Sequence, residues 1–185
     1  MIGVLVSGEG TNLQALLDAG LPVVAVASNV PGAYALRRAD AASVPVAVFL
    51  LEDYPSRETR DLAMAAWLES RGVRLVVCAG YMHLLTGAFL ARFRALNVHP
   101  SLLPRFPGRH PIEDVLAAGV TATGVTVHFV DEGIDSGPVV AQEAVPILLG
   151  DTVETLRERI QAVEHRLLPE AARLCLTGDL ESRPE

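Results

Sequence analysis

The chain has few cysteines and no long hydrophobic run. Its two cysteines among 185 residues, Cys78 and Cys175, lack the spacing of a metal site, and we interpret both as thiols of the hydrophobic core in a reducing compartment. No apolar run approaches the roughly 20 residues of a membrane span, and no basic leader precedes the first apolar run at Ile2. These absences predict a soluble, cytoplasmic protein without a membrane partner.

Basic residues are also scarce: 15 lysines and arginines stand against 22 acidic residues, which gives a formal net charge of -7. A broad surface for nucleic acid needs a net basic face, so we expect small-molecule ligands and no nucleic-acid partner. A local basic pocket can still hold a small anion. Half of the residues are hydrophobic, enough for one substantial core, and we expect a single domain over residues 1–185. No stripe of residues identifies an oligomer interface, so a monomer and a homodimer both stay open.

Apolar runs alternate with helical patterns along the first half of the chain. The predicted strands span Ile2–Val6, Val23–Ala27, Val46–Phe49 and Leu75–Cys78, and the predicted helices follow Thr11, Gly32 and Pro55. A fifth short strand ends near Val98, and a helix from about Ile112 to Ala118 follows the loop 100–111. This order is typical of parallel strands joined by helical crossovers.

The pattern changes after that helix. Thr121–Val130 and Val139–Ile147 are rich in β-forming residues and are joined by a short acidic turn, which predicts an antiparallel extension of the sheet. The predicted fold class is therefore α/β: one domain with a doubly wound, mostly parallel, Rossmann-like sheet extended by C-terminal antiparallel strands.

A long helix is predicted at the end of the chain. We expect Asp151 to be its N-cap because Glu154 follows three residues later, Pro169 to kink it, and Gly178 to cap its C-terminus. The polar segment 179–185 has little to bury and is expected to fray.

The loop Ser7–Asn12 lacks the full signature of either common nucleotide-binding loop. Leu13 stands where the dinucleotide fingerprint needs a third glycine, and no Gly-Lys-Ser/Thr follows, so neither NAD nor a P-loop is favoured. A tight turn between a strand and a helix N-terminus still exposes backbone N–H groups that can bind an anion, with Thr11 and Asn12 adding side-chain donors. A glycine turn used only for close packing is the alternative.

Three polar residues follow predicted strand ends in the second half. Asn97 and His99 face the same side because strand side chains repeat every second residue, and Asp135 lies in the turn between the two late strands. Imidazole can exchange a proton near neutral pH, and an amide can stabilise a developing oxyanion, so the three residues suit acyl or formyl transfer. Turn capping by Asn97 and Asp135, with a structural His99, is the alternative.

The remaining histidines carry weaker signals. We interpret His128 as structural or supporting, His110 as either a ligand contact or an exposed side chain, and His165 as a surface group. His83 follows a strand directly and is placed to line a pocket. No Gly-x-Ser-x-Gly elbow and no His-Glu-x-x-His motif is present, so direct attack of a bound amine on an acyl donor is favoured over covalent or metal catalysis.

Six motifs in a fixed order resemble the glycinamide ribonucleotide formyltransferases, a family of folate-dependent enzymes of purine biosynthesis. The resemblance covers about residues 2–177, and its motifs are Ser7–Asn12, Ala79–Met82, Asn97–Pro104, Thr126–Val130, Ile134–Pro138 and Glu164–His165. It implies the formyltransferase fold and transfer of the formyl group of 10-formyltetrahydrofolate to the amine of glycinamide ribonucleotide on the route to IMP, without a metal.

The resemblance also implies roles for individual residues. The catalytic residues would be Asn97, His99 and Asp135. The ribonucleotide and its phosphate would be held by Gly10, Thr11, Asn12 and Glu164. The folate would lie against Arg57, Met82, His83, Leu84, Leu85, Val130, Asp131, Glu132 and Ile134, and supporting roles would fall to His110 and His128. Residues 1–95 would then form the nucleotide-binding half, residues 96–178 the catalytic and folate-binding half, and residues 179–185 a tail.

Two departures from the family pattern leave alternatives open. The family usually has Met-Arg where this chain has Met82-His83, and the loop 109–113 lacks a second histidine that some members carry after His110. Because His83 replaces the usual arginine, a nucleotide- or folate-binding protein without catalysis stays open. Methionyl-tRNA formyltransferase and formyltetrahydrofolate hydrolase share the later motifs, but they lack this form of the glycine loop. The first also generally has a further C-terminal domain, and the second an extra N-terminal one.

Overall fold

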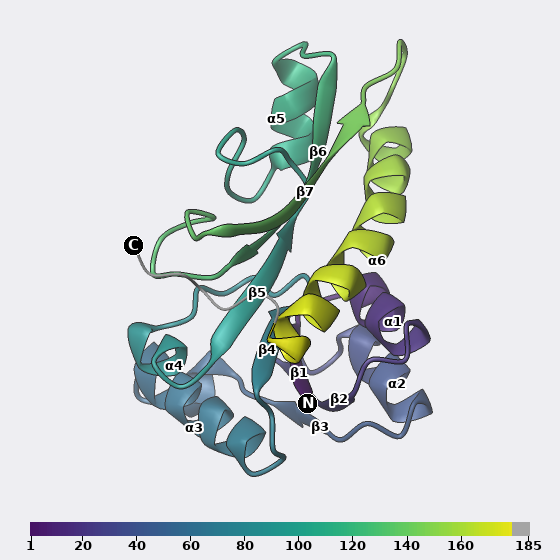
Figure 1. Cartoon of the computed structure of the whole chain (residues 1–185). Helices are drawn as coiled ribbons and strands as arrows, with labels where there is room; N and C mark the ends of the chain where they lie inside the picture. Colours follow the sequence, from purple (N-terminus) through teal and green to yellow (C-terminus); the bar gives the residue numbers. More distant parts are fainter. Residues whose placement is uncertain (179–185) are drawn as a thin grey trace.

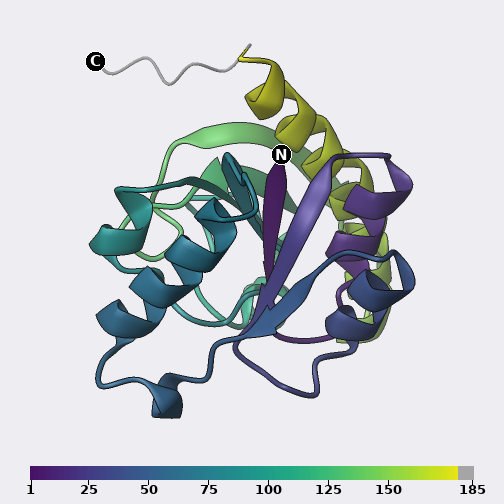
Figure 2. The ribbon, with the colours of Figure 1, turned by 90° about the horizontal axis from the view of Figure 1, so that it is seen from below.

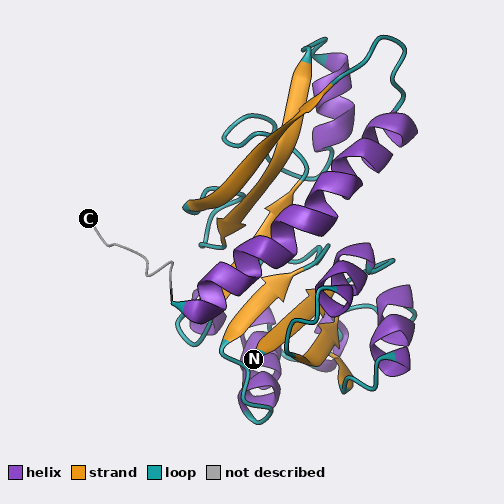
Figure 3. Ribbon diagram, turned by 45° about the vertical axis from the view of Figure 1, so that its right-hand side comes forward, coloured by secondary structure: helices purple, strands orange, loops and turns teal. Residues whose placement is uncertain are grey.

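The computed structural model describes residues 1–178 and contains one seven-stranded sheet with helices on both faces (Figures 1 and 3). The strands are β1 (Ile2–Val6), β2 (Val23–Ser28), β3 (Val46–Val48), β4 (Leu75–Cys78), β5 (Arg94–His99), β6 (Ala122–Phe129) and β7 (Val139–Pro146). The helices are α1 (Thr11–Asp18), α2 (Tyr34–Ala41), a 3₁₀ turn (Leu51–Asp53), α3 (Arg57–Glu69), α4 (Gly87–Leu90), α5 (Pro111–Ala117) and α6 (Val153–Thr177). The predicted elements are all present, with small shifts of their bounds.

The sheet has the order β3-β2-β1-β4-β5-β6-β7. The first five strands in this order are parallel, whereas β6 pairs antiparallel with both β5 and β7. The predicted fold class is confirmed. The chain runs outward from β1 to β3 and then returns to β4 on the other side of β1, so β1 and β4 flank the point where strand order reverses. Ligands of open α/β sheets bind outside the strand ends at such a point.

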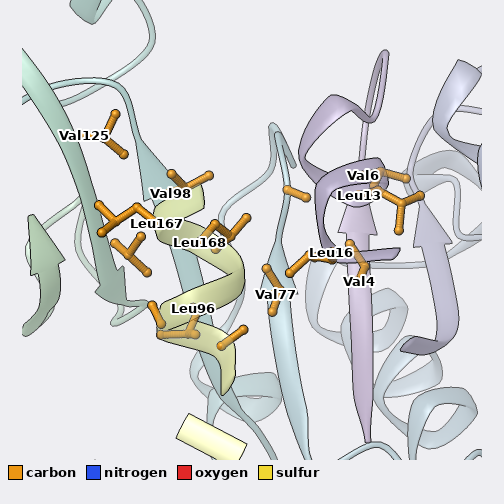
Figure 4. Packing of buried hydrophobic residues seen from close by; sticks show 14 of the residues in the cluster. Val4, Val6, Leu13, Leu16, Val77, Leu96, Val98, Val125, Leu167 and Leu168 are labelled. Carbon is orange, nitrogen blue, oxygen red and sulfur yellow. The ribbon is translucent and has the colours of Figure 1, made fainter. Parts of the chain in front are cut away.

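The core has two layers because the parallel strands are buried on both faces. One layer packs the sheet against α1, α2 and α6, and the other packs it against α3 and α4 (Figure 2). Figure 4 shows the first layer, in which side chains of β1, β4 and β5 meet those of α1 and α6: Val4, Val6, Val77, Leu96 and Val98 against Leu13, Leu16, Leu167 and Leu168. Helix α6 lies diagonally across this layer (Figure 1). Both halves of the chain therefore share one core.

The start of α6 differs from the prediction by one residue. Its N-cap is Thr152, whose hydroxyl accepts the Thr155 N–H, while the Thr155 hydroxyl accepts the Thr152 N–H. Asp151 was the wrong residue because its carboxylate is already bound to the Arg159 guanidinium at 2.8 and 2.9 Å and to the Leu148 N–H. A charged partner with two parallel hydrogen bonds is a stronger competitor than a helix terminus.

The end of α6 agrees with the sequence pattern. Gly178 ends the helix in the left-handed conformation, with φ of 82°, as predicted. The helix continues through Pro169 to Thr177, and a kink at that proline stays a prediction. The predicted fraying of residues 179–185 lies outside the described residues. Within residues 1–178 no helix combines the length and the apolar character that crossing a membrane requires.

Candidate active site

The predicted site residues gather at the carboxyl ends of the parallel strands. Ser7 follows β1, Gly80 to Leu85 follow β4, His99 ends β5, and Asp135 lies in the β6–β7 turn. A cavity of about 570 Å³ opens between the last three of these segments. Its lining includes Asn97, His99, His110, His128 and Asp135. The fold thus brings together side chains that lie far apart in the sequence.

Asp135 is the centre of the polar cluster in this cavity. Its backbone is left-handed, with φ of 52°, and its side chain contacts residues of β5 and β6. The Gly108 N–H donates to one carboxylate oxygen at 2.9 Å, and His99 Nδ1 lies 3.4 Å from the same oxygen. The other oxygen accepts from Asn97 Nδ2 at 3.4 Å and lies 3.6 Å from His128 Nε2. Three side chains therefore face one half-buried carboxylate.

The pKa of Asp135 shows how these neighbours act on its charge. Burial alone would raise the pKa of the carboxyl group. The contacts with His128 and the Gly108 N–H, together with the nearby imidazole of His99, outweigh burial and lower the pKa below its ordinary value. Asp135 is therefore ionised at neutral pH and supplies a negative charge to the two imidazoles.

Both ring nitrogens of His99 face hydrogen-bond acceptors. Nε2 lies 2.8 Å from the Phe106 carbonyl oxygen, and Nδ1 faces Asp135. This arrangement satisfies both N–H groups of a protonated imidazole. The ring is almost fully buried, and β5 fixes its backbone, so it has little freedom to turn. His99 is held with Nδ1 towards the cavity.

His128 lies beside Asn97 on the neighbouring antiparallel strand. Its Nδ1 donates to the Phe129 carbonyl oxygen at 2.8 Å, and its Nε2 lies 3.3 Å from Asn97 Nδ2 and 3.6 Å from an Asp135 carboxylate oxygen. Asn97 and His128 are also direct partners in the register between β5 and β6. His128 therefore lies against both Asn97 and Asp135, and a supporting role for it stays a prediction.

The glycine loop lies at the next strand end. Gly10 has φ of 72°, and a Cβ at this position would meet the Ala35 Cβ at 2.5 Å, so only glycine fits between the loop and α2. Helix α1 begins directly after it at Thr11 and presents its N-terminus. The loop is tied to the segment after β4 because Ser7 Oγ accepts the Met82 N–H at 2.9 Å.

Asn12 connects this loop with α6. Its Nδ2 donates to Glu164 Oε2 at 3.2 Å, while its side-chain oxygen is buried without a partner among the described residues. Glu164 is itself buried, and burial raises its pKa, with the single hydrogen bond from Asn12 opposing that rise. Neither residue lines the large cavity, so the predicted ribonucleotide residues form a neighbouring surface rather than one continuous pocket with Asp135.

The predicted folate wall is mostly brought together. The members that line the cavity are Met82, His83, Leu84, Leu85, Val130, Asp131 and Ile134. Three of the apolar members, Met82, Leu84 and Ile134, are about half exposed, which leaves an open apolar rim. Arg57 and Glu132 do not line the cavity: Arg57 is exposed at the first residue of α3, and Glu132 is exposed on the β6–β7 turn.

The structure refines two interpretations of single residues. His165 is half-buried rather than on the surface, its Nε2 is buried without a partner within residues 1–178, and burial lowers its pKa. Cys175 is half-buried at the edge of the core, whereas Cys78 is fully buried and burial raises its pKa to about 12. Residues 1–178 contain no group of three or more His, Cys, Asp and Glu side chains that could hold a metal ion.

Sequence reasoning missed Arg60 and Asp61, which lie behind the cavity wall. Both are fully buried on α3, and the Arg60 guanidinium contacts both Asp61 and His83. A signal was present, because these two charged residues precede Met64, Ala65 and Leu68 at helical spacing on the buried face. Charged residues are rarely buried in a core unless they are paired with another charged or polar group.

Comparisons with known proteins agree with this geometry. A family model described as formyl transferase matches residues 1–172. The chain is 50% identical over 171 residues to the phosphoribosylglycinamide formyltransferase of Mycobacterium tuberculosis, covering 89% of this chain and 80% of that protein. It is 44% identical to a trifunctional purine biosynthetic protein of Drosophila pseudoobscura pseudoobscura, covering 97% of this chain but only 14% of that protein's length.

A solved structure shares the whole architecture. The glycinamide ribonucleotide transformylase 1 of Symbiobacterium toebii superimposes with a TM-score of 0.95 at 49% identity, covering 98% of this chain and 91% of that one. The family model, the curated relatives and the shared sheet all lead to the same assignment. The chain belongs to the formyl transferase family.

Proposed function

We propose that this chain transfers the formyl group of 10-formyltetrahydrofolate to the amine of glycinamide ribonucleotide, as the names of its relatives suggest. The observation that carries the proposal is the cluster of Asn97, His99 and Asp135 on the wall of the large cavity. These residue types supply an amide donor, an imidazole and a carboxylate at one point. Formyl transfer needs a hydrogen-bond donor to the developing oxyanion and a group that carries a proton, and this cluster has both.

The two substrates would approach from neighbouring strand ends. The formyl donor, with its flat ring system, suits the apolar rim formed by Met82, Leu84 and Ile134. The phosphate of the ribonucleotide suits the N–H groups of the loop Gly10 to Asn12 at the start of α1. The amine would then reach the formyl carbon beside Asp135, where the two surfaces meet.

The chemistry needs no covalent bond to the protein. The amine nitrogen attacks the formyl carbon, a new C–N bond forms, and the formyl oxygen becomes negative. Asn97 Nδ2 and the protonated His99 are placed to donate to that oxygen, because their contacts with Asp135 are 3.4 Å long and can be exchanged for a shorter one. The bond to the folate nitrogen then breaks, as that nitrogen takes up the proton lost by the amine. Asp135 would carry this proton directly or through water.

The test is an absorbance assay with 10-formyl-dideazafolate, run with and without glycinamide ribonucleotide. We expect turnover only when the ribonucleotide is present. Equal turnover without the ribonucleotide would show that the chain hydrolyses the formyl donor, and this would overturn the proposal. Binding of the analogue without any turnover would instead show a folate-binding protein.

A further inference from the structure

A fully buried ion pair stands behind the cavity wall. Arg60 Nε and Nη2 donate to one oxygen of Asp61 at 2.9 and 2.5 Å, and both side chains are excluded from solvent. The other Asp61 oxygen accepts the Thr86 N–H at 2.9 Å. We define Met82 to Leu85 as the wall segment. The ion pair is therefore hydrogen-bonded to the backbone just after the wall segment.

Arg60 also contacts the wall segment directly, on its buried side. Its third nitrogen, Nη1, lies 2.6 Å from Nδ1 of His83. An arginine guanidinium has only donors, so His83 must accept at Nδ1, and a neutral ring then carries its proton on Nε2. Nε2 lies 3.3 Å from the side-chain amide of Asn29, whose oxygen must then be the atom that faces this ring N–H. His83 is thus held as one neutral tautomer. The wall segment is fixed on its other side by Ser7 Oγ, which accepts the Met82 N–H.

The charges around His83 all favour this neutral form except one. Burial lowers its pKa first, and the positive charges of Arg60, Arg57 and Arg109 lower it further, against the opposing charge of Asp61. The Tyr81 ring packs edge-on against the imidazole with centroids 5.9 Å apart, and because burial raises the pKa of Tyr81 it adds no charge at neutral pH. Protonation of His83 would place two donors against each other and would break the contact with Arg60.

We propose that Arg60 is a positioning residue of the formyl-donor site, which holds the wall segment by donating to a neutral His83, so that positions 60 and 83 together carry one positive charge. The identity of the ligand rests on the proposed function, but the hydrogen bond itself does not. We expect a second cation at position 83 to be repelled by Arg60, and an arginine at position 83 to pair with Asp61 once Arg60 has been removed.

The first test reads the histidine directly, without a ligand. Side-chain ¹⁵N NMR of the wild-type chain should show His83 as the Nε2–H tautomer, with a titration midpoint below the ordinary value of about 6.5. The signal is assigned by its loss in His83→Gln. A ring that titrates at the ordinary midpoint, or a proton resident on Nδ1, would overturn the proposal, whatever the chain proves to catalyse.

The second test exchanges the charge. Arg60→Met and His83→Arg should each weaken binding of 10-formyl-dideazafolate by about tenfold, the worth of one hydrogen bond to a charged group. The double variant Arg60→Met/His83→Arg should return to within about threefold of wild type, because the guanidinium introduced at position 83 then replaces that of Arg60 as the partner of Asp61. Losses that simply add up would overturn the proposal. Arg60→Met risks unfolding. If Arg60→Met is insoluble, the affinity of His83→Arg for 10-formyl-dideazafolate decides the test, and wild-type affinity in His83→Arg would overturn the proposal.

The third readout separates positioning from general damage. In His83→Arg the KM for the formyl donor should rise, while kcat and the KM for glycinamide ribonucleotide stay near wild type. His83→Gln keeps an acceptor without a titrating ring, so its donor affinity should not weaken further as the pH is lowered, whereas that of wild type should. Arg71→Met is the matched control, because Arg71 stacks on Trp67 just beyond the far end of α3 and should change none of these values. If transfer is absent altogether, the proposed function fails, and the NMR test still decides this proposal.

Discussion

The Asp135 cluster and the Arg60–Asp61 pair are two carboxylate centres of opposite character. Around Asp135 the side-chain contacts are 3.4 to 3.6 Å long, and the group is half-buried. Around Asp61 they are 2.5 to 2.9 Å long, and no part is exposed to solvent. Hydrogen-bonding capacity that the fold has already used is not available to a ligand. The loose cluster is therefore suited to chemistry, and the tight one to holding the wall in place.

The largest effect should come from the loose cluster. His99→Ala removes the imidazole that faces the cavity, so kcat should fall by about 10²- to 10⁴-fold. The variant also loses the contact with the Phe106 carbonyl oxygen, so urea denaturation is used to verify that it is folded under the assay conditions. His110→Ala is the matched control, because His110 lines the same cavity but is exposed and outside the cluster. The assay is steady-state turnover of the formyl donor with saturating ribonucleotide. Near-normal turnover in His99→Ala would remove His99 from the mechanism.

The tight pair should show the reverse pattern, with a large effect on folding. Arg60→Met leaves Asp61 buried without its partner, which costs about 3–5 kcal/mol of unfolding free energy. Arg60→Met/Asp61→Asn removes both charges and should recover most of that loss, because an amide oxygen can still accept the Thr86 N–H. Urea denaturation measures both values. Equal losses in the two variants would mean that the pair does not act as a unit.

The glycine loop is a third region, in which close backbone packing rather than an ion pair constrains the structure. Gly10→Ala forces a side chain into a left-handed residue and against Ala35, so we expect a loss of about 1–3 kcal/mol. Gly8→Ala is the control in the same loop, since nothing lies within 4 Å of its Cβ position. Thermal unfolding compares the two variants, and a stable Gly10→Ala would contradict this account of the loop.

The sequence predicted the loose cluster better than the tight one, for a physical reason. Asn97, His99 and Asp135 stand at strand ends and in a turn, where the topology of the sheet alone brings them together. The contact between Arg60 and His83 depends instead on how α3 packs against the segment after β4. Hydrophobic periodicity places α3 on the sheet but does not say which polar atoms meet behind it.

Prediction from the sequence also failed where two side chains could bind the same partner. Asp151 has the sequence pattern of an N-cap, yet Arg159 binds it and Thr152 caps the helix instead. The short helix α4 and the 3₁₀ turn were not predicted, because four and three residues carry no readable period. Family resemblance supplied the predicted roles of Glu164 and Arg57, which no local pattern of residues would have suggested.

Glu164 lies between the two extremes and gives the smallest expected effect. It is buried like Asp61, but it has one hydrogen bond, from Asn12 at 3.2 Å, and its pKa is raised by burial. A carboxyl group whose pKa is higher in the folded state favours folding most when it is protonated, and this contribution is lost as the pH rises through the folded-state pKa. Glu164→Gln should therefore be more stable than wild type at pH 7, and the two should converge below about pH 4. Urea denaturation at both pH values measures the difference. A Glu164→Gln variant that is less stable at pH 7 would show that Asn12 pairs with Glu164 as firmly as Arg60 pairs with Asp61.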